Sequence, residues 1–420
     1  MQGTVAALLA EIVGTSAIDP SGNPGVIAVH PDGEEQISQI CRLAQDHKWR
    51  LVPRNRPLVQ QNSTPTVVLY TDKLVGISEY APGDMIVSVR SGTPFEALQD
   101  SLRTKQQMLA LDPVCDSHAT VGGLVACAAY GPSRVGYGVL RDMVTGMRVV
   151  RADGSVIKVG SKVVKNVAGY DLPKLFIGSH GSLGIITECT FKLRPIPRHR
   201  TLFALTGSAT EIARIYQEIM RRALSVCALE LVGAPQSSPS SNSDDWMLLV
   251  GSDEVADAAQ ALQAQIQAID GRVSLEIMQN SQVAEFWNRY RQELIPAATV
   301  LRVQMAPTRM VAFAASLRQV LSELGISVKW SLTLSEGVGK IYGHDRDPKN
   351  VETLVNTVVR QCQSTMASSV IEALPPEFLW TQPMMQSPRV RESELRLMQQ
   401  IKDAYDPRGI FNPGVYARGM

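Results

Sequence analysis

Hydrophobic and polar residues alternate with two different periods near the N-terminus. Val26–Val29 is a short apolar run, which is typical of a buried strand. Apolar residues then recur at helical spacing up to Ala44, and Asp32 with Glu35 predicts an N-cap and capping box for that helix. Trp49–Val52 predicts the next strand. The order strand, helix, strand indicates a βαβ beginning.

The next hundred residues predict short elements. Strands are expected at Val67–Tyr70 and Met85–Arg90, and Thr93-Pro94 with Glu96 predicts a capped helix start. Between residues 113 and 199 glycine becomes frequent. There, strands are expected at Met143–Arg151, Ser155–Val159 and Gly184–Leu193, with a hairpin turn at Ala152–Gly154. The prolines of Arg194–Pro197 mark a domain boundary.

From residue 200 to about 380, strand-like and helix-like runs alternate. The predicted strands are 201–206, 226–232, 246–251, 299–305, 326–332 and 368–374. The predicted helices are 209–223, 254–268, 308–323 and 348–362, and a final helix is expected near 390–404. This alternation indicates a sheet covered by helices and favours ferredoxin-like units.

Composition excludes several classes of protein. The 420 residues suffice for about two or three domains. Since 41 basic residues balance 40 acidic ones, there is no electrostatic case for nucleic acid as the main partner. No apolar run reaches the ~18 residues of a membrane helix. The six cysteines form no CxxC pair, which favours free thiols in a reducing compartment and a cytoplasmic protein.

Two glycine clusters carry the strongest chemical signal. Gly122-Gly123 precedes a run of small helix formers, so bare N–H groups at a helix start could receive an anion; the alternative is a tightly packed core helix. Gly178–Gly184 could let backbone approach a flat ligand, although on its own this segment favours an ordinary glycine-rich turn before a strand. No GxGxxG follows a strand, and the P-loop, HExxH and GxSxG patterns are absent. With six histidines at no ligand spacing, no metal site is predicted, and a bound redox cofactor is favoured.

Residues 112–197 resemble the FAD-binding domain shared by vanillyl-alcohol oxidase, p-cresol methylhydroxylase and the D-2-hydroxy-acid dehydrogenases. The nearest likeness is to the FAD-binding E subunits of bacterial glycolate oxidases. The segments that carry it are DP at 112–113, ATVGG at 119–123, YGVLRDMV at 137–144, KVVKNVAGYDL at 162–172 and GSLGIIT at 181–187. Phe286-Trp287 with Arg291, and FNPG at 411–414, match more loosely.

The resemblance implies a set of cofactor-binding residues. Thr120, Gly122 and Gly123 would hold the FAD pyrophosphate, and Asn412 would reach the cofactor from the C-terminal segment. Gly184, Ile185 and Ile186 would pack on the adenine end. The residues expected along the path to the ribityl chain and isoalloxazine are Ala126, Gly131, Ser133, Tyr137, Gly138 and Asp142, with Pro113 also near the cofactor.

The sequence departs from the family in two places. The first loop usually carries glycines, but here it reads PRNRPL at 53–58, where Arg54, Asn55 and Arg56 are the candidates for phosphate contact. The histidine cluster of the larger catalytic subunits has no counterpart. Arg302 is a candidate for a substrate carboxylate, or else an ordinary salt bridge. His344 is a candidate base, or else a surface histidine.

These features predict an α+β protein. A two-subdomain FAD-binding domain (1–199) would be followed by an α+β, ferredoxin-like cap domain (200–380) and a C-terminal segment (381–420) that returns to the FAD-binding domain. The resemblance implies non-covalent FAD and oxidation of a small 2-hydroxy acid to the 2-oxo acid.

The implied setting is a glycolate-oxidase-like complex with a larger FAD-containing catalytic subunit and an iron–sulfur subunit. The protein would be cytoplasmic, with membrane association only through that complex. Two alternatives stay open: a stand-alone FAD-dependent D-2-hydroxy-acid dehydrogenase, and a non-catalytic scaffold subunit.

Overall fold

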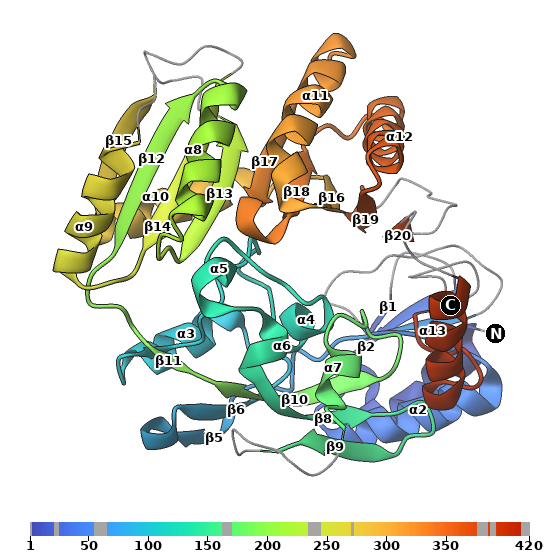
Figure 1. Ribbon diagram of the computed structural model, residues 1–420. Helices are drawn as coiled ribbons and strands as arrows, with labels where there is room; N and C mark the ends of the chain where they lie inside the picture. Colours follow the sequence, from blue (N-terminus) through green and yellow to red (C-terminus); the bar gives the residue numbers. More distant parts are fainter. Residues whose placement is uncertain are drawn as a thin grey trace.

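The described residues form four sheets, three in the lower part of the molecule and one in its upper part as drawn in Figure 1. The computed structural model describes residues 2–20, 25–53, 65–161, 170–233, 245–269, 273–375, 385–386 and 392–412. Within these residues no helix is both long enough and apolar enough to span a bilayer.

The first sheet contains the predicted βαβ beginning. Its strand order is β1-β2-β4-β3, with β2, β4 and β3 parallel and β1 antiparallel to β2. The bounds are β1 Ile18–Pro20, β2 Val26–Val29, β3 Arg50–Pro53, β4 Thr66–Leu69, α1 Gln2–Val13 and α2 Glu34–His47. The capping box at Asp32 and Glu35 is wrong, because α2 has Gly33 as its N-cap and no side-chain cap.

The second sheet is antiparallel, in the order β5-β6-β10-β8-β9. Its strands are β5 Ile77–Ala81, β6 Ile86–Arg90, β8 Val144–Val150, β9 Val156–Gly160 and β10 Ile185–Lys192. The hairpin between β8 and β9 is present, and Gly154 takes a φ of +77° in its turn. Helix α3 (Phe95–Arg103) has Pro94 as its N-cap. The predicted cap at Thr93 is wrong, since that hydroxyl donates to Arg90 O at 2.7 Å instead.

Short elements connect these sheets. A two-stranded ribbon pairs β7 (Gln107–Met108) with β11 (Arg194–Pro195). The short helices are α4 Val121–Ala126, α5 Arg134–Tyr137, α6 Leu140–Met143 and α7 Pro173–Phe176. The 3-10 helices are Thr15–Ala17, Pro82–Asp84, Pro307–Arg309 and Leu334–Glu336.

The upper sheet is built from two ferredoxin-like units of order βαββαβ. Its nine strands run β15-β12-β14-β13-β17-β18-β16-β19-β20. The first unit is β12 Thr201–Gly207, α8 Ala209–Arg221, β13 Ala228–Gly233, β14 Trp246–Ser252, α9 Ala256–Gln267 and β15 Ser274–Gln279. The second is β16 Thr299–Gln304, α11 Met310–Glu323, β17 Val328–Thr333, β18 Val338–Gly343, α12 Pro348–Ser364 and β19 Ser368–Ala373, followed by β20 Met385–Gln386. The expected α+β class with a ferredoxin-like cap is confirmed.

The two faces of the upper sheet are covered differently. Helices α8, α9, α11 and α12 share one large hydrophobic core with the sheet, and Figure 1 shows α8 and α11 lying across it. Helix α10 (Ser281–Leu294) joins the two units and packs on the opposite face through Val283, Phe286 and Trp287. Apart from α10, that opposite face is therefore available for polar residues whose side chains point toward the lower sheets.

A buried carboxyl group lies where the two units meet. Strand β13 pairs with β17 at Glu230↔Thr333. Glu230 is fully buried and accepts hydrogen bonds from Ser331 Oγ at 2.5 Å and Thr333 Oγ1 at 2.8 Å. Burial raises the pKa of Glu230 to about 7, although both hydroxyl bonds oppose that rise.

The C-terminal segment returns to the first sheet. Helix α13 (Glu392–Tyr405) lies beside the N-terminal part of the chain in Figure 1. Beyond it, Leu51 N donates to Ile410 O at 2.7 Å and Asn412 N donates to Leu51 O at 3.0 Å. Residues 410–412 thus add a short parallel bridge next to β3.

Candidate functional site

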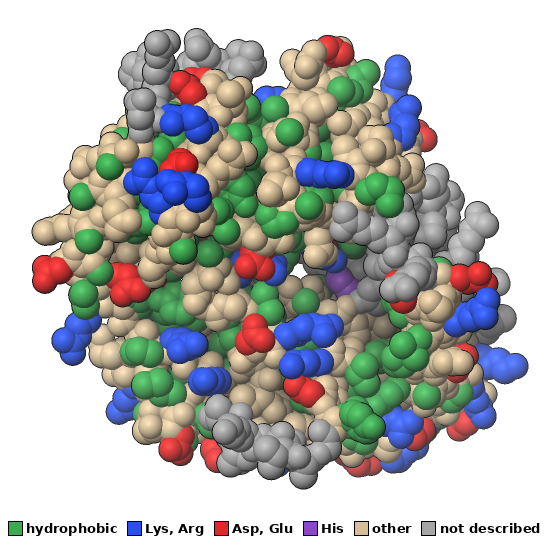
Figure 2. Space-filling model, viewed as in Figure 1, with side chains coloured by type: hydrophobic (Ala, Val, Ile, Leu, Met, Phe, Trp, Pro, Cys, Tyr) green, Lys and Arg blue, Asp and Glu red, His purple; other side chains and the backbone are tan. Residues whose placement is uncertain are grey.

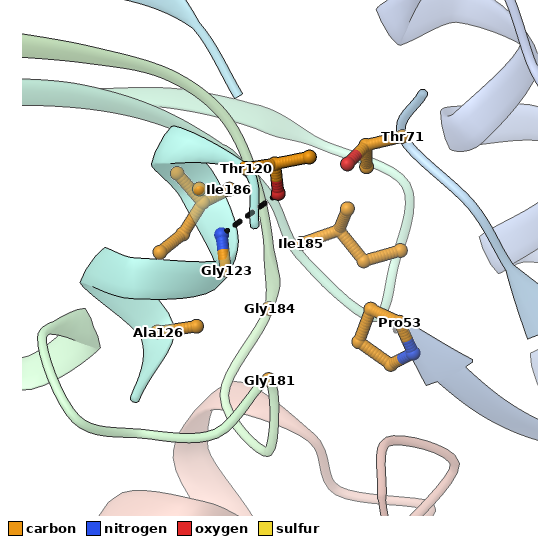
Figure 3. Close-up of a pocket in the computed structure, with 10 residues that line it drawn as sticks. Pro53, Thr71, Thr120, Gly123, Ala126, Gly181, Gly184, Ile185 and Ile186 are labelled. Atoms are coloured by element: carbon orange, nitrogen blue, oxygen red, sulfur yellow. Dashed lines mark hydrogen bonds between the residues drawn. The ribbon is translucent and has the colours of Figure 1, made fainter. Parts of the chain in front are cut away.

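A pocket of about 420 Å³ opens where helix α4 begins. Figure 3 shows its walls coming from α4, from the turn before β10, and from the ends of β3 and β4. The lining residues are Pro53, Thr71, Thr120, Gly122, Gly123, Ala126, Gly181, Gly184, Ile185 and Ile186. The described lining residues combine bare backbone, two hydroxyls and apolar side chains, and none of them is charged.

The start of α4 explains why two glycines stand together. Thr120 is the N-cap, and its hydroxyl accepts from Gly123 N at 3.3 Å (Figure 3). Gly122 packs on Ser91: its N–H donates to Ser91 O at 2.8 Å, and a Cβ at Gly122 would lie 2.5 Å from Ser91 Cβ. A Cβ at Gly123 would meet only Thr120 Oγ1, at 3.2 Å. Gly122 is thus required by packing, whereas the bare Gly123 faces the space of the pocket.

The opposite wall needs glycine for close approach. Gly181 has a φ of +70°, and a Cβ there would lie 2.5 Å from Pro53 Cγ. A Cβ at Gly184 would lie 2.6 Å from Val149 Cγ1. The first contact lets the turn at 178–184 sit directly against the end of β3, and the second lets it approach β8. The pocket is therefore narrow and walled by backbone, a shape suited to a phosphate-bearing cofactor.

Seven predicted cofactor-binding residues line this one pocket. They are Thr120, Gly122, Gly123, Ala126, Gly184, Ile185 and Ile186. Asn412 lies just behind the wall: its side chain is buried and donates from Nδ2 to His180 O at 2.6 Å. Arg54, Asn55 and Arg56 lie outside the described residues.

The other predicted cofactor contacts do not line the pocket. Ser133 donates from Oγ to Asp112 at 2.6 Å, beside Pro113, and a Cβ at Gly131 would lie 2.0 Å from Asp112 O. Tyr137 donates its hydroxyl to Asp253 Oδ2 of the cap at 2.8 Å.

The last two predicted cofactor contacts, Gly138 and Asp142, lie at the turn between α5 and α6. Asp142 accepts from Val139 N at 3.2 Å, and Gly138 has a φ of +84°. In this structure the 131–142 segment therefore docks the cap onto the FAD-binding part.

Asp112 anchors that docking segment. It accepts from both the N–H and the hydroxyl of Ser133. Burial raises the pKa of Asp112 to about 6, although the Ser133 bonds act in the opposite direction.

The cap places a charged cluster opposite the docking segment. Arg302 Nε lies 2.9 Å from Glu372 Oε1, and Lys340 Nζ lies 2.8 Å from Glu372 Oε2. Lys340 Nζ also lies 4.7 Å from the ring centre of Tyr130, in the segment after α4. Figure 2 shows a hollow between the upper and lower parts of the molecule.

The two candidate catalytic residues have different surroundings. Arg302 belongs to this charged cluster and forms a salt bridge with Glu372, as in the second of the two interpretations of Arg302 given from the sequence. His344 is exposed, and its Nε2 lies 3.1 Å from Glu293 O. Among the described residues, no group of His, Cys, Asp and Glu side chains is arranged to hold a metal ion.

Sequence reasoning missed several residues of both regions. Thr71 of the pocket was not singled out, and neither were Lys340, Tyr130 and Glu372 of the cluster; Pro53 and Gly181 were noted only as members of the first loop and of the second glycine cluster. Thr71 and Pro53 directly follow predicted parallel strands, whose carboxyl ends meet at one sheet edge; that was the available signal. No local pattern marks the cluster, since Tyr130, Arg302, Lys340 and Glu372 come from four separate segments of the chain.

Two family models match the chain. One, described as an FAD binding domain, matches residues 26–160, and one for the C-terminal domain of FAD linked oxidases matches residues 387–416. The first range contains the start of α4 and the second contains Asn412. Both matches therefore fall on segments that build or back the pocket.

The chain is also similar to glycolate oxidase subunits and to a D-lactate dehydrogenase. It is 40% identical to the glycolate oxidase subunit GlcE of Escherichia coli over 143 residues, which are 33% of this chain and 41% of that protein. It is 26% identical to the subunit GlcD of Bacillus subtilis over 92% of this chain and 87% of that protein. The D-lactate dehydrogenase of Archaeoglobus fulgidus is 25% identical over 96% and 94% of the two chains.

Solved structures show the same fold at low sequence identity. The 4-ethylphenol oxidase of Gulosibacter chungangensis superposes with a TM-score of 0.72 at 16% identity, covering 99% of this chain and 98% of that one. An alkyldihydroxyacetonephosphate synthase gives 0.69 at 14% identity, covering 92% and 75%.

The matches to an FAD binding domain and to the C-terminal domain of FAD linked oxidases indicate an FAD-dependent oxidoreductase, and the solved structures show that its fold is of the p-cresol methylhydroxylase type. Its cofactor is FAD. Within that class, the chain is a homologue of glycolate oxidase subunits and of D-lactate dehydrogenases.

Proposed function

We propose that this chain is the FAD-binding subunit of a glycolate-oxidase-like complex that oxidises a small 2-hydroxy acid to the 2-oxo acid. The observation that carries the proposal is the backbone-walled pocket at Thr120–Gly123, which falls inside the match to the FAD binding domain. The 40% identity to GlcE supports the E-subunit assignment.

The pocket residues fit the cofactor in type and position. Thr120, Gly122 and Gly123 would hold the pyrophosphate, because the open side of Gly123 leaves room for an anionic oxygen that a Cβ would displace. Ile185 and Ile186 would give the adenine end an apolar wall. When bound, FAD supplies the hydride acceptor for the substrate Cα–H.

Other residues would support that binding. Asn412 would fix the turn at His180–Gly181 through its bond to His180 O. Arg54, Asn55 and Arg56, outside the described residues, are proposed as phosphate contacts of the first loop. The 131–142 segment would hold the cap over the flavin through Gly131, Ser133, Tyr137, Gly138 and Asp142. We also propose that the FAD-binding domain ends near residue 199 and that the cap ends near residue 380.

Oxidation also requires a base to accept the proton of the substrate hydroxyl, and His344 is a poor candidate for that role in this chain. His344 is exposed at the end of β18 and bonded to a backbone carbonyl. We therefore assign the base to the larger FAD-containing subunit, and electron transfer onward to an iron–sulfur subunit. This chain would then relay electrons or support the complex.

A second function is favoured by one comparison. The D-lactate dehydrogenase of Archaeoglobus fulgidus aligns along 94% of its own length, cap included. A stand-alone D-2-hydroxy-acid dehydrogenase is therefore the second candidate. It would need Arg302 and the charged cluster to receive the substrate and a base from the same chain.

An anaerobic reduction experiment separates the two functions. The purified FAD-loaded chain is mixed with glycolate, D-lactate or D-2-hydroxyglutarate, and the visible absorbance of oxidised flavin is followed. We expect little bleaching with the chain alone and rapid bleaching when the larger subunit is added. Rapid bleaching by the chain alone would establish the second function. A chain that takes up no FAD would overturn both.

A further inference from the structure

Two cations of the cap sheet stand side by side. Arg302 on β16 and Lys340 on β18 are direct register partners, so their side chains leave the sheet on the same face. Their neighbours Leu301 and Ile341 are buried in the core on the other face. Like charges placed directly opposite each other repel. This pair is therefore stable only with an anion between the two groups.

Glu372 supplies that anion from an irregular position in the sheet. On β19, Ala373 pairs with Val300 and Ile371 pairs with Leu301, so Glu372 is the extra residue of a β-bulge. A bulge turns a side chain out of the regular alternation, and bulges are frequent beside active sites. Here the bulge gives one carboxylate oxygen to Arg302 and the other to Lys340.

The cluster keeps unused donors. Glu372 occupies only Nε of Arg302, and among the described residues the two terminal nitrogens of that guanidinium have no hydrogen-bond partner. The Arg302 side chain is 30% exposed, against 14% for Lys340. Two cations against one carboxylate leave one surplus positive charge. The cluster therefore has both the charge and the free donors to take a second, external carboxylate.

Tyr130 brings a further donor from the FAD-binding part. Its ring lies under Lys340 and also under Arg134, whose guanidinium carbon is 4.7 Å from the ring centre. Its hydroxyl is buried and has no hydrogen-bond partner among the described residues. Burial holds the pKa of Tyr130 well above its usual value, and nearby Glu372 adds to this effect, so the group stays a donor.

A buried hydroxyl without a partner is costly. Such a group has given up its hydrogen bond to water without gaining another in the protein. An acceptor atom from a ligand beside the cations would remove that cost.

We propose that Arg302, Lys340 and Tyr130 form a binding subsite for the carboxylate of the acid substrate, and that Glu372 is a built-in competitor for the same cations. This inference rests on the proposed function for the nature of the ligand. Glu372 keeps the two cations together in the empty site and repels an incoming carboxylate. The affinity for small acids is consequently set low by the chain itself, and it rises when the charge of Glu372 is removed.

The test uses an acid that binds but cannot react. 2-Hydroxy-2-methylpropanoate carries the hydroxyl and the carboxylate but no Cα–H, so no hydride can leave it. Its Kd for the FAD-loaded chain is measured by calorimetry and by perturbation of the flavin absorbance. The uncharged 2-methylpropane-1,2-diol serves as the ligand control, and we expect it to bind far more weakly than the acid.

The variants should change the Kd of the acid in opposite directions. Glu372→Gln should tighten binding of the acid at least about tenfold, since it removes a like charge while keeping the side-chain shape. Lys340→Met and Tyr130→Phe should each weaken it roughly tenfold. Glu293→Gln is the matched control, because Glu293 is also paired with a lysine of the cap, Lys329 at 2.8 Å, but on the exposed surface. Its Kd should equal that of the parent chain.

The outcomes separate this inference from the proposed function. Unchanged or weaker acid binding by Glu372→Gln would overturn the inference, as would equal binding of the diol. If Glu372→Gln does not fold, Tyr130→Phe decides, because it leaves the ion pairs intact; unchanged acid binding there would also overturn it. If binding tightens while no hydroxy acid ever reduces the flavin, the subsite stands and the proposed oxidation fails.

Discussion

Lys402 and Asp406 form a buried ion pair at the end of α13, with Nζ 2.5 Å from Oδ2. The same Nζ donates to Ser182 O at 2.7 Å and to Phe411 O at 2.9 Å. Asp406 also accepts from the N–H groups of Ile410 and Phe411. One lysine thus ties α13, the C-terminal bridge and the glycine turn of the FAD pocket together.

Lys402→Met should therefore destabilise the protein strongly. Removing one partner leaves the Asp406 carboxylate buried and unpaired, which costs about 3–5 kcal/mol. Urea unfolding measures the loss. Lys174→Met is the control: Lys174 pairs with Asp171 at 2.8 Å on the surface, and its loss should cost about 1 kcal/mol or less. Equal effects of the two substitutions would show that the buried pair has no special structural role.

The two glycines of α4 should respond differently to added side chains. Gly123→Val fills the open side of the pocket and should cost FAD about one to two decades of affinity, by removing a hydrogen bond to a charged group. The unloaded protein should keep its stability, since the Cβ meets only Thr120 Oγ1.

Gly122→Ala should instead lower the stability of the unloaded protein, because its Cβ clashes with Ser91. FAD titration and thermal unfolding of the apo-protein distinguish the two effects. Normal FAD affinity in Gly123→Val would refute the assignment of the pyrophosphate to this loop.

The FAD should be bound without a covalent link. Among the residues that the structure describes, no histidine or cysteine lines the pocket, and these are the side chains that commonly attach flavins covalently. Acid precipitation should leave the flavin in the supernatant. A yellow pellet would contradict this prediction, and Cys115 and His118, which precede α4, would then be the first residues to examine by peptide mapping.

Glu230 should make the stability of the cap depend on pH. Its pKa is about 7 in the folded protein, against an ordinary value of 4.5. Between these values the unfolded chain loses the proton first, so unfolding becomes easier as pH rises. The contribution is fully present below about pH 4.5 and is lost as the pH passes 7, by on the order of 3 kcal/mol.

Glu230→Gln should flatten this part of the stability profile. Urea unfolding of both proteins at pH 5 and pH 8 gives the difference. Glu276→Gln, an exposed site on β15 of the same sheet, should leave the profile as it is. Parallel profiles for the parent chain and Glu230→Gln would mean that Glu230 ionises normally.

Most elements of the fold could be predicted from local patterns, and the exceptions have physical causes. Strand β15 is half exposed, and β18 is buried but contains two glycines and a lysine, so neither shows a continuous run of large apolar residues in the sequence. Without them the two βαββαβ units looked incomplete in the sequence. The capping boxes at Asp32 and Thr93 failed because Gly33 and Pro94 are the N-caps of those helices.

Part of the candidate site could be predicted from the sequence and part could not. Thr120–Gly123 could be found because a helix start and its anion-binding geometry are local properties of a few consecutive residues. The cluster of Arg302, Lys340 and Glu372 could not, since it depends on strand register and on one bulge in the sheet. Tyr130 joins it only because the cap docks on the FAD-binding part.

The bridge between β3 and residues 410–412 also bears on how the protein folds. Arg408 and Gln45, which meet beside this bridge, are 363 positions apart in the chain. Closing so long a loop is entropically costly before its contacts form, and contacts of this kind slow folding. The wall of the pocket at Pro53 and Gly181 is backed by this late-closing segment. We therefore expect the pocket to be among the last regions completed during folding, so that flavin uptake would report on a late folding step.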